Sequence, residues 1–173
     1  MSVETPLRPS RAVAAGRPAR YALAAGRLFL GWIFLWAFAD KLFGLGKPAV
    51  KGWLSGVSPS EGFLSHAGGP FRDVFHAMAG KVWVDALFMF GLGGLAAALL
   101  LGILLRLAAI GGTVLLAMLW AASLWPDANP FMDMHWIYAA ALVSAALGDA
   151  GRTLGFGRVW ERLPLVRRHP ILR

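Results

Sequence analysis

One apolar stretch constrains this chain more than any other, the run from Tyr21 to Gly44, YALAAGRLFLGWIFLWAFADKLFG. An α-helix needs about 20 apolar residues to cross the hydrocarbon core of a bilayer, and this run is long enough. It nevertheless contains Arg27 near one end and Asp40-Lys41 near the other. In a helix, Arg27 and Lys41 point almost the same way, separated by roughly 21 Å along the axis. Because the hydrocarbon core is about 30 Å thick, these cations must either snorkel to the headgroups or face neighbouring helices.

The composition is that of a membrane protein. Of the 173 residues, 58% are hydrophobic and only 15% are charged, whereas a soluble domain is nearer a quarter charged. The net charge is +8, and the basic residues lie beside the apolar blocks. Anionic lipid is therefore a better partner for them than nucleic acid. The chain has no cysteine, which excludes disulfides, thiolate metal sites and cysteine-based sulfur transfer within it.

Further apolar blocks predict an all-α integral membrane four-helix bundle over residues 21–150. The segment from Val82 to Pro126 is about twice as long as one span, and it can turn only at residues 102–106, which contain Gly102 and Arg106. This predicts a second helix over about 82–101 and a third over about 107–126. The fourth helix is expected to start near Asp133 and to end near residues 148–149.

The two ends of the chain are basic. Residues 1–20 are rich in Arg, Pro and Ala and are expected to form a disordered cytoplasmic tail, and residues 151–173 a basic amphipathic tail on the inner leaflet. Twelve Lys and Arg residues flank the spans on the side of the termini and five on the other. The positive-inside rule then places both termini in the cytoplasm of a multi-pass plasma-membrane protein. Residues 37–39 also resemble a signal-peptide cleavage site, so cleavage of residues 1–39 stays open.

Residues 45–80 form the longest polar interruption, and Gly and Pro recur there too often for a long helix. Phe71, Val74, Phe75 and Met78 fall at helical spacing, which predicts a short interfacial helix in the first external loop. His76 and His66 are interpreted as solvated surface residues.

The first candidate site consists of charged residues on the first two helices. Arg27 and Lys41 either mark the ends of the first helix or line a polar cavity, with Asp40 or Asp85 as counter-charge. Asp85 follows Lys81 by one turn and is expected on the same outer side as Asp40. These side chains are the candidate ligands of a cofactor.

The second candidate site precedes the fourth helix. Asp133 is well placed to cap that helix, and His135 could exchange protons or bond a quinone carbonyl. These two residues are the candidate catalytic pair. Metal binding is not predicted, because no second histidine follows at metal-ligand spacing within a helix.

An ordered set of motifs resembles the DoxX/DoxD family from about Ala22 to Arg162. The motifs are Arg27-x3-Gly31 with Asp40-Lys41, Trp53-Leu54-Ser55-Gly56-Val57-Ser58-Pro59, Leu105-Arg106-Leu107-Ala108-Ala109, and Asn129-Pro130-Phe131 with Asp133-x-His135-x2-Tyr138. The resemblance implies a four-helix membrane protein related to the membrane subunit of thiosulfate:quinone oxidoreductase. Without cysteine, any sulfur chemistry would need a non-thiol mechanism or a partner subunit.

Two functions follow as expectations. The first is a membrane subunit of a quinone-linked oxidoreductase, with quinone as cofactor and a protein partner subunit. The alternative is a non-catalytic membrane anchor or assembly subunit for a partner redox enzyme. A transporter is less favoured, because the helices lack the interrupted pairs that form midplane substrate sites.

Overall fold

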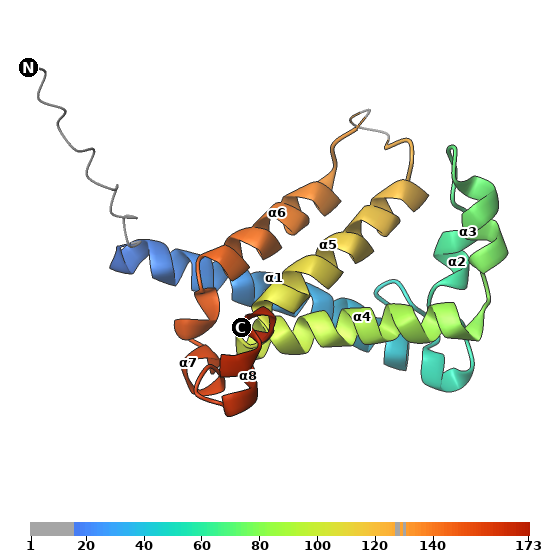
Figure 1. Cartoon of the computed structure of the whole chain (residues 1–173). Coiled ribbons are helices and arrows are strands. Elements are labelled where there is room, and N and C mark those ends of the chain that lie inside the picture. The colour runs from blue at the N-terminus through green and yellow to red at the C-terminus, as the bar shows by residue number, and fades with distance from the viewer. Residues whose placement is uncertain (1–15, 127–128, 130) are drawn as a thin grey trace, which may run out of the picture.

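The computed structural model describes residues 16–126, 129 and 131–173, and over these residues the fold is all-helical, with no strand (Figure 1). Four long helices carry the fold, and short helical segments follow α1 and α6. In chain order the elements are α1 (Arg17–Phe43), η1 (Trp53–Ser55), α2 (Glu61–Leu64), α3 (Arg72–Met78), α4 (Val82–Leu101), α5 (Leu105–Ala122), α6 (Met134–Leu147), η2 (Ala150–Arg152), α7 (Gly157–Trp160), α8 (Pro164–Arg168) and η3 (Pro170–Leu172).

Helices α1 and α4 end at glycines in the left-handed conformation. Gly44 has φ 73° and donates its N–H to the Asp40 carbonyl, and Gly102 has φ 71° and donates to the Ala98 carbonyl. Glycine is favoured here because a side chain would strain a backbone with positive φ. The bounds of α4 are those predicted from the sequence.

The start of α1 and both ends of α5 differ from the prediction. α1 begins at Arg17, so the last four residues of the expected tail are helical, since Pro18 favours a first helical turn and Ala and Arg are good helix formers. α5 begins at Leu105 rather than at residue 107, directly after the turn at Gly102. It ends at Ala122 rather than at 126, because Pro126 disfavours helical backbone in the residue before it.

Three helices, α1, α4 and α5, are long and apolar enough to cross a membrane. α6 is also apolar but has only 14 residues, so the predicted fourth span is shorter than the other three. Large apolar side chains cover the outside of these helices: Phe29 on α1 is 71% exposed and Phe90 on α4 is 78% exposed. Such a surface is suited to lipid, because water-exposed faces of soluble proteins rarely carry apolar patches of this size.

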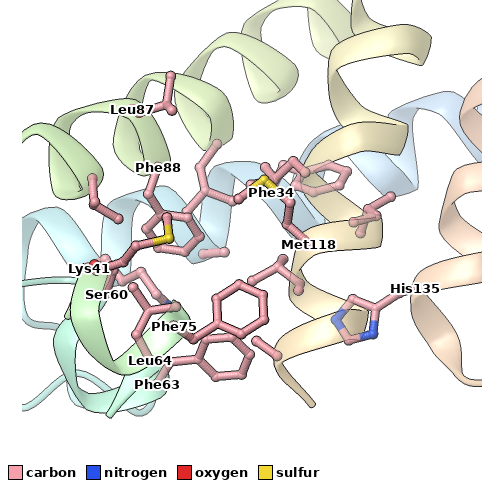
Figure 2. Close-up of a pocket in the computed structure, with 18 of the residues that line it drawn as sticks. Phe34, Lys41, Ser60, Phe63, Leu64, Phe75, Leu87, Phe88, Met118 and His135 are labelled. Carbon is pink, nitrogen blue, oxygen red and sulfur yellow. The ribbon is translucent and has the colours of Figure 1, made fainter. Parts of the chain in front are cut away.

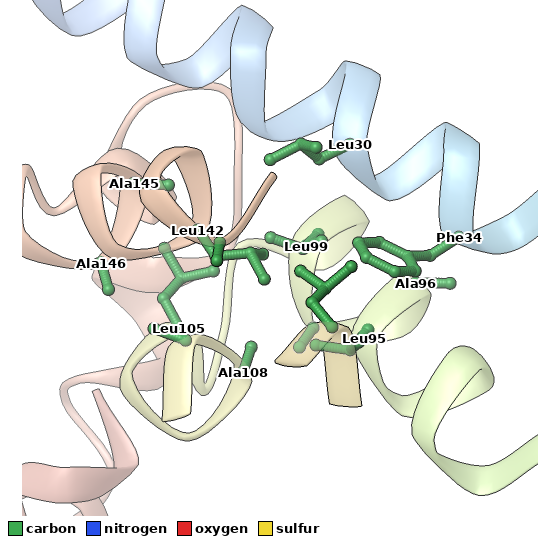
Figure 3. Packing of buried hydrophobic residues seen from close by; sticks show 14 of the residues in the cluster. Leu30, Phe34, Leu95, Ala96, Leu99, Leu105, Ala108, Leu142, Ala145 and Ala146 are labelled. Atoms are coloured by element: carbon green, nitrogen blue, oxygen red, sulfur yellow. The ribbon is translucent and has the colours of Figure 1, made fainter. Parts of the chain in front are cut away.

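The long helices pack as two pairs, α1 along α4 and α5 along α6. The main core lies where the pairs meet, and Figure 3 shows Leu30 of α1, Leu99 of α4, Leu105 of α5 and Leu142 of α6 converging there. Gly31 allows α1 to approach α4 closely, because a Cβ at this position would lie 2.9 Å from the Leu100 side chain. Small residues are what membrane helices use to pack closely, where lipid removes the hydrophobic driving force.

The two pairs diverge away from this core, and α2 and α3 lie at the far end of α4 (Figure 1). Here Leu64 of α2 and Phe75 of α3 are buried with Val84 of α4 and Ala122 of α5 in a second, smaller core. The helix predicted in the first loop is therefore present as α3, and its Phe75 packs against the bundle. Its position at a membrane interface remains a prediction.

The C-terminal residues, predicted to be an amphipathic tail, fold against the end of the bundle opposite α3. Phe156 N–H donates to the Leu101 carbonyl (2.8 Å), and Arg106 N–H donates to the Arg173 carbonyl (2.9 Å). Val166 of α8 is 1% exposed. This segment therefore covers the turn between α4 and α5.

Candidate functional site

Arg27 is buried in α1 at the tightly packed end of the bundle, with only 1% of its surface exposed. Its guanidinium donates to the Leu99 and Leu100 carbonyls at the end of α4, and to the Thr153 and Leu154 carbonyls before α7. The last carbonyls of a helix have no intrahelical donor, so Arg27 satisfies groups that would otherwise be orphaned. Within the described residues, no carboxylate forms an ion pair with Arg27. The sequence had suggested Asp40 or Asp85 as its counter-charge, but its partners are these backbone carbonyls instead.

Asp40 and Asp85 are also buried, and both organise the first external loop. The Asp40 carboxylate accepts the N–H groups of Lys47 and Ala49, each at 2.9 Å. Asp85 Oδ1 accepts the hydroxyls of Ser58 (2.8 Å) and Ser60 (2.6 Å). Both carboxylates accept hydrogen bonds from residues of the loop that follows α1, and these bonds hold the loop in place.

Lys41 differs from its neighbour Asp40 because its side chain borders a cavity. Its Nζ lies 5.9 Å from the centre of the Phe88 ring, close enough for a cation–π interaction. In the described part of the chain no carboxylate oxygen lies within ion-pairing distance of Nζ. This ammonium group can therefore offer N–H donors to a molecule in the cavity.

Asp133 and His135 interact directly at the start of α6. Asp133 caps the helix by accepting the His135 backbone N–H at 3.0 Å, as predicted, and its other oxygen lies 2.6 Å from His135 Nδ1. A carboxylate at this distance favours a proton on Nδ1, because a deprotonated nitrogen would repel it. In the neutral ring, Nε2 is then left as a proton acceptor.

Lys41 and His135 line the same cavity, which has a volume of about 410 Å³. It lies between the diverging helix pairs and is closed on one side by α2 and α3. Figure 2 shows Lys41 and His135 on opposite sides, with the rings of Phe63 and Phe75 between them. The remaining lining is mostly apolar, with Ser60 and Tyr138 as further polar residues: Ile33, Phe34, Ala37, Pro48, Leu64, Met78, Trp83, Val84, Leu87, Phe88, Leu92, Leu115, Leu116, Met118, Leu119, Ala122 and Met134.

The structure therefore brings together only part of the predicted set. Lys41 and His135 share the cavity, with Asp133 behind His135, whereas Arg27, Asp40 and Asp85 do not line it. The sequence pattern singled out Phe75 and Met78 as one face of a helix but gave no sign that this face closes a cavity. Ser60 and Phe63 carried no signal at all, because they lie in a loop and a single helical turn.

The two loop histidines have backbone partners. His76 is half-buried rather than solvated, and its Nε2 lies 3.1 Å from the Ala67 carbonyl oxygen. His66 is exposed, as expected, and its Nδ1 lies 2.7 Å from the Gly62 carbonyl oxygen. Over the residues that the structure describes, no three His, Cys, Asp or Glu side chains form a cluster suited to a metal ion.

Comparison with known proteins found no matching family model, and no significant match among curated proteins or solved structures. Function must therefore be argued from the cavity and the groups that face it.

Proposed function

We propose that this protein binds a quinone in the cavity between the helix pairs, as the membrane subunit of a quinone-linked oxidoreductase related to the DoxX/DoxD family. One observation carries the proposal: an apolar cavity among membrane-capable helices has an ammonium group on one side and an imidazole–carboxylate pair on the other. Ligand sites of about 300–1,000 Å³ with few polar groups in an apolar lining are typical of small-molecule binding.

The lining fits a flat, lipid-soluble ring that carries oxygens on opposite edges. Phe63, Phe75 and Phe88 offer aromatic faces to such a ring, and Met118 offers a flexible thioether. Lys41 donates N–H groups to an oxygen on one edge and stabilises negative charge there. Bound quinone supplies the capacity to accept two electrons and two protons.

His135 and Asp133 are suited to proton transfer at the other edge. Asp133 holds Nδ1 of the ring, so Nε2 is oriented to exchange a proton with a bound ligand. We propose that a ligand from the bilayer enters between α4 and α5, where the cavity-lining residues Leu87 and Met118 are exposed. If both termini lie in the cytoplasm, as the sequence predicts, this cavity faces the outer leaflet.

The test is titration of the full chain in lipid nanodiscs with a short-chain quinone, read by quenching of tryptophan fluorescence. Lys41→Met is expected to weaken quinone binding about tenfold, the loss that one charge-assisted hydrogen bond of about 1.5 kcal/mol produces. His135→Gln is expected to weaken binding of the corresponding quinol, whose hydroxyl group can donate to Nε2. Leu119→Trp, which fills the cavity, is expected to abolish saturable quenching.

Two exposed residues of the same loop region provide matched controls. Lys51→Met and His66→Gln remove the same functional groups outside the cavity and are expected to leave binding unchanged. Saturable quenching that survives Leu119→Trp, or the absence of any saturable quenching in the unmodified protein, contradicts the proposal.

The alternative, a non-catalytic anchor for a partner redox enzyme, is favoured by the structural use of Arg27, Asp40 and Asp85. Under this alternative, the combined Lys41→Ala and His135→Ala variant assembles with its partner and leaves the partner's quinone reduction intact. Co-purification from the native membrane with mass spectrometry identifies the partner for this assay. Loss of quinone reduction in an assembled complex favours the first proposal.

A further inference from the structure

A second cavity, lined by four arginines, lies at the end of the molecule opposite the quinone cavity. Its volume is about 280 Å³, and Arg17 and Arg20 of α1, Arg152 of η2 and Arg158 of α7 all border it. The other lining residues are Tyr21, Thr153 and Leu154. The start of α1 and the segment after α6 lie close together at this end (Figure 1).

One of the four arginines is already paired. Arg152 forms ion pairs with Asp149 (3.0 Å) and Glu161 (2.9 Å). The hydrogen bond that Arg152 donates to Glu161 raises the pKa of Arg152 above its usual value. Burial opposes this effect, and the charges of Asp149 and Glu161 add to it. The positive charge of Arg152 is thus balanced by two carboxylates, which also hold its side chain in place at the edge of the cavity.

The other three arginines carry the excess positive charge of the cavity. Arg17, Arg20 and Arg158 are exposed, and within the described residues none of them has an ion pair within 4.0 Å. Guanidinium groups bind phosphate oxygens through two parallel N–H donors, which makes arginine the preferred residue for this anion. Three converging and uncompensated guanidinium groups favour a ligand with more than one negative charge.

Buried Arg27 fixes the floor of this cavity. It donates to the carbonyls of Thr153 (3.4 Å) and Leu154 (2.7 Å), both of which line the cavity. The loop is therefore tied to the core of the bundle through α1, so the arginines on either side of it keep a defined spacing. A site held in this way loses little conformational entropy on binding.

Apolar side chains beside the arginines indicate a lipid rather than a soluble anion. Tyr21 of α1, a helix long enough to span a bilayer, is 56% exposed. In the segment between η2 and α7, Leu154 is 60% exposed and Phe156 is 62% exposed. We infer that this cavity binds the phosphate headgroup of an anionic phospholipid, with Leu154 and Phe156 against its acyl chains. Basic pockets at the cytoplasmic ends of membrane helices bind such headgroups. This inference does not rest on the quinone proposal.

The experiment is native mass spectrometry of the detergent-released full chain, titrated with diphosphatidylglycerol, which has two phosphates. Phosphatidylglycerol is expected to bind more weakly and phosphatidylcholine not detectably. The double variant Arg20→Gln with Arg158→Gln is expected to weaken diphosphatidylglycerol binding about 30-fold. Arg167→Gln with Arg168→Gln removes the same charge from exposed positions of α8 outside the cavity and is the matched control.

Each result bears on the inference. Selective loss in the Arg20 and Arg158 variant supports it, whereas equal loss in both double variants shows diffuse attraction and overturns it. Displacement of the lipid by an equal concentration of inorganic pyrophosphate overturns the lipid assignment in favour of a soluble anion. Should the double variant fail to fold, the exposed single substitution Arg17→Gln tests the same cavity, and unchanged binding there overturns the inference.

Discussion

The two ends of the helix bundle use charged residues in opposite ways. At the tightly packed end, Arg27 is enclosed and both terminal nitrogens of its guanidinium donate to backbone carbonyls. At the open end, Lys41 and His135 border a cavity of about 410 Å³. Both Arg27 and Lys41 are cations on one helix, yet only the second is available for binding. The difference teaches that a charge on an apolar helix can be satisfied by neighbouring backbone, as at Arg27, or can be left facing a cavity, as at Lys41.

The largest effect is expected from Arg27→Met, which tests whether the packed end depends on this charge. It leaves buried carbonyls of α4 and of the 153–154 loop without donors, and each such group costs about 1–3 kcal/mol. We expect the free energy of unfolding to fall by about 3 kcal/mol or more. Thermal unfolding in detergent, followed by tryptophan fluorescence, measures it.

Arg168→Gln is the control for this measurement, because Arg168 is exposed and should change stability little. A wild-type melting temperature in Arg27→Met would show that the carbonyls find other donors, and the contrast between the two ends would then lose its basis.

The next effect is expected from Gly151→Ala, which probes close backbone packing at the same end. A Cβ at Gly151 would overlap the Gly102 carbonyl oxygen, and backbone atoms cannot move aside as a side chain does. The free energy of unfolding is expected to fall by about 1–3 kcal/mol, the usual cost of overpacking.

Gly111→Ala provides the opposite result in the same assay. Nothing lies within 4 Å of a Cβ at Gly111, which is inside α5. Alanine there is expected to raise the free energy of unfolding by about 0.5–1 kcal/mol, because it favours the helix more than glycine does. Equal effects of the two substitutions would contradict the packing that the structure shows.

The smallest loss of stability is expected at the open end, from Asp85→Ala. It leaves the buried Ser60 hydroxyl and N–H without their acceptor, at a cost of about 1–2 kcal/mol. Limited proteolysis is expected to cut the loop before α2 faster, while Asp73→Ala, at an exposed position of α3, leaves the rate unchanged. Unaltered cleavage in Asp85→Ala would mean that the loop is held by its apolar contacts alone.

Much of the helical framework could be predicted from the sequence, because periodicity and glycine placement are local properties. The bounds of α4, the presence of α3 and the capping of α6 by Asp133 all follow from patterns a few residues long. The choice of Lys41 as a candidate rested on the cost of placing a charge in an apolar segment, and the choice of His135 on the ability of imidazole to exchange protons.

The partners of the charged residues could not be predicted, because they depend on long-range packing. The Leu99 and Leu154 carbonyls that bind Arg27 lie 72 and 127 positions away in the chain. Backbone carbonyls are present at every residue, so no sequence pattern marks the ones that a guanidinium will reach. The same holds for Ser60, which reaches Asp85 only because α2 folds back onto α4.

The unequal lengths of α1 and α6 have a consequence for the surrounding bilayer. With a rise of 1.5 Å per residue, the 27 residues of α1 extend about 40 Å and the 14 residues of α6 about 21 Å. A hydrocarbon core of about 30 Å matches neither, so α1 is expected to tilt and the lipid beside α6 to thin. Hydrophobic mismatch would thus act asymmetrically around the protein, and lipids with shorter acyl chains should gather on the α6 side.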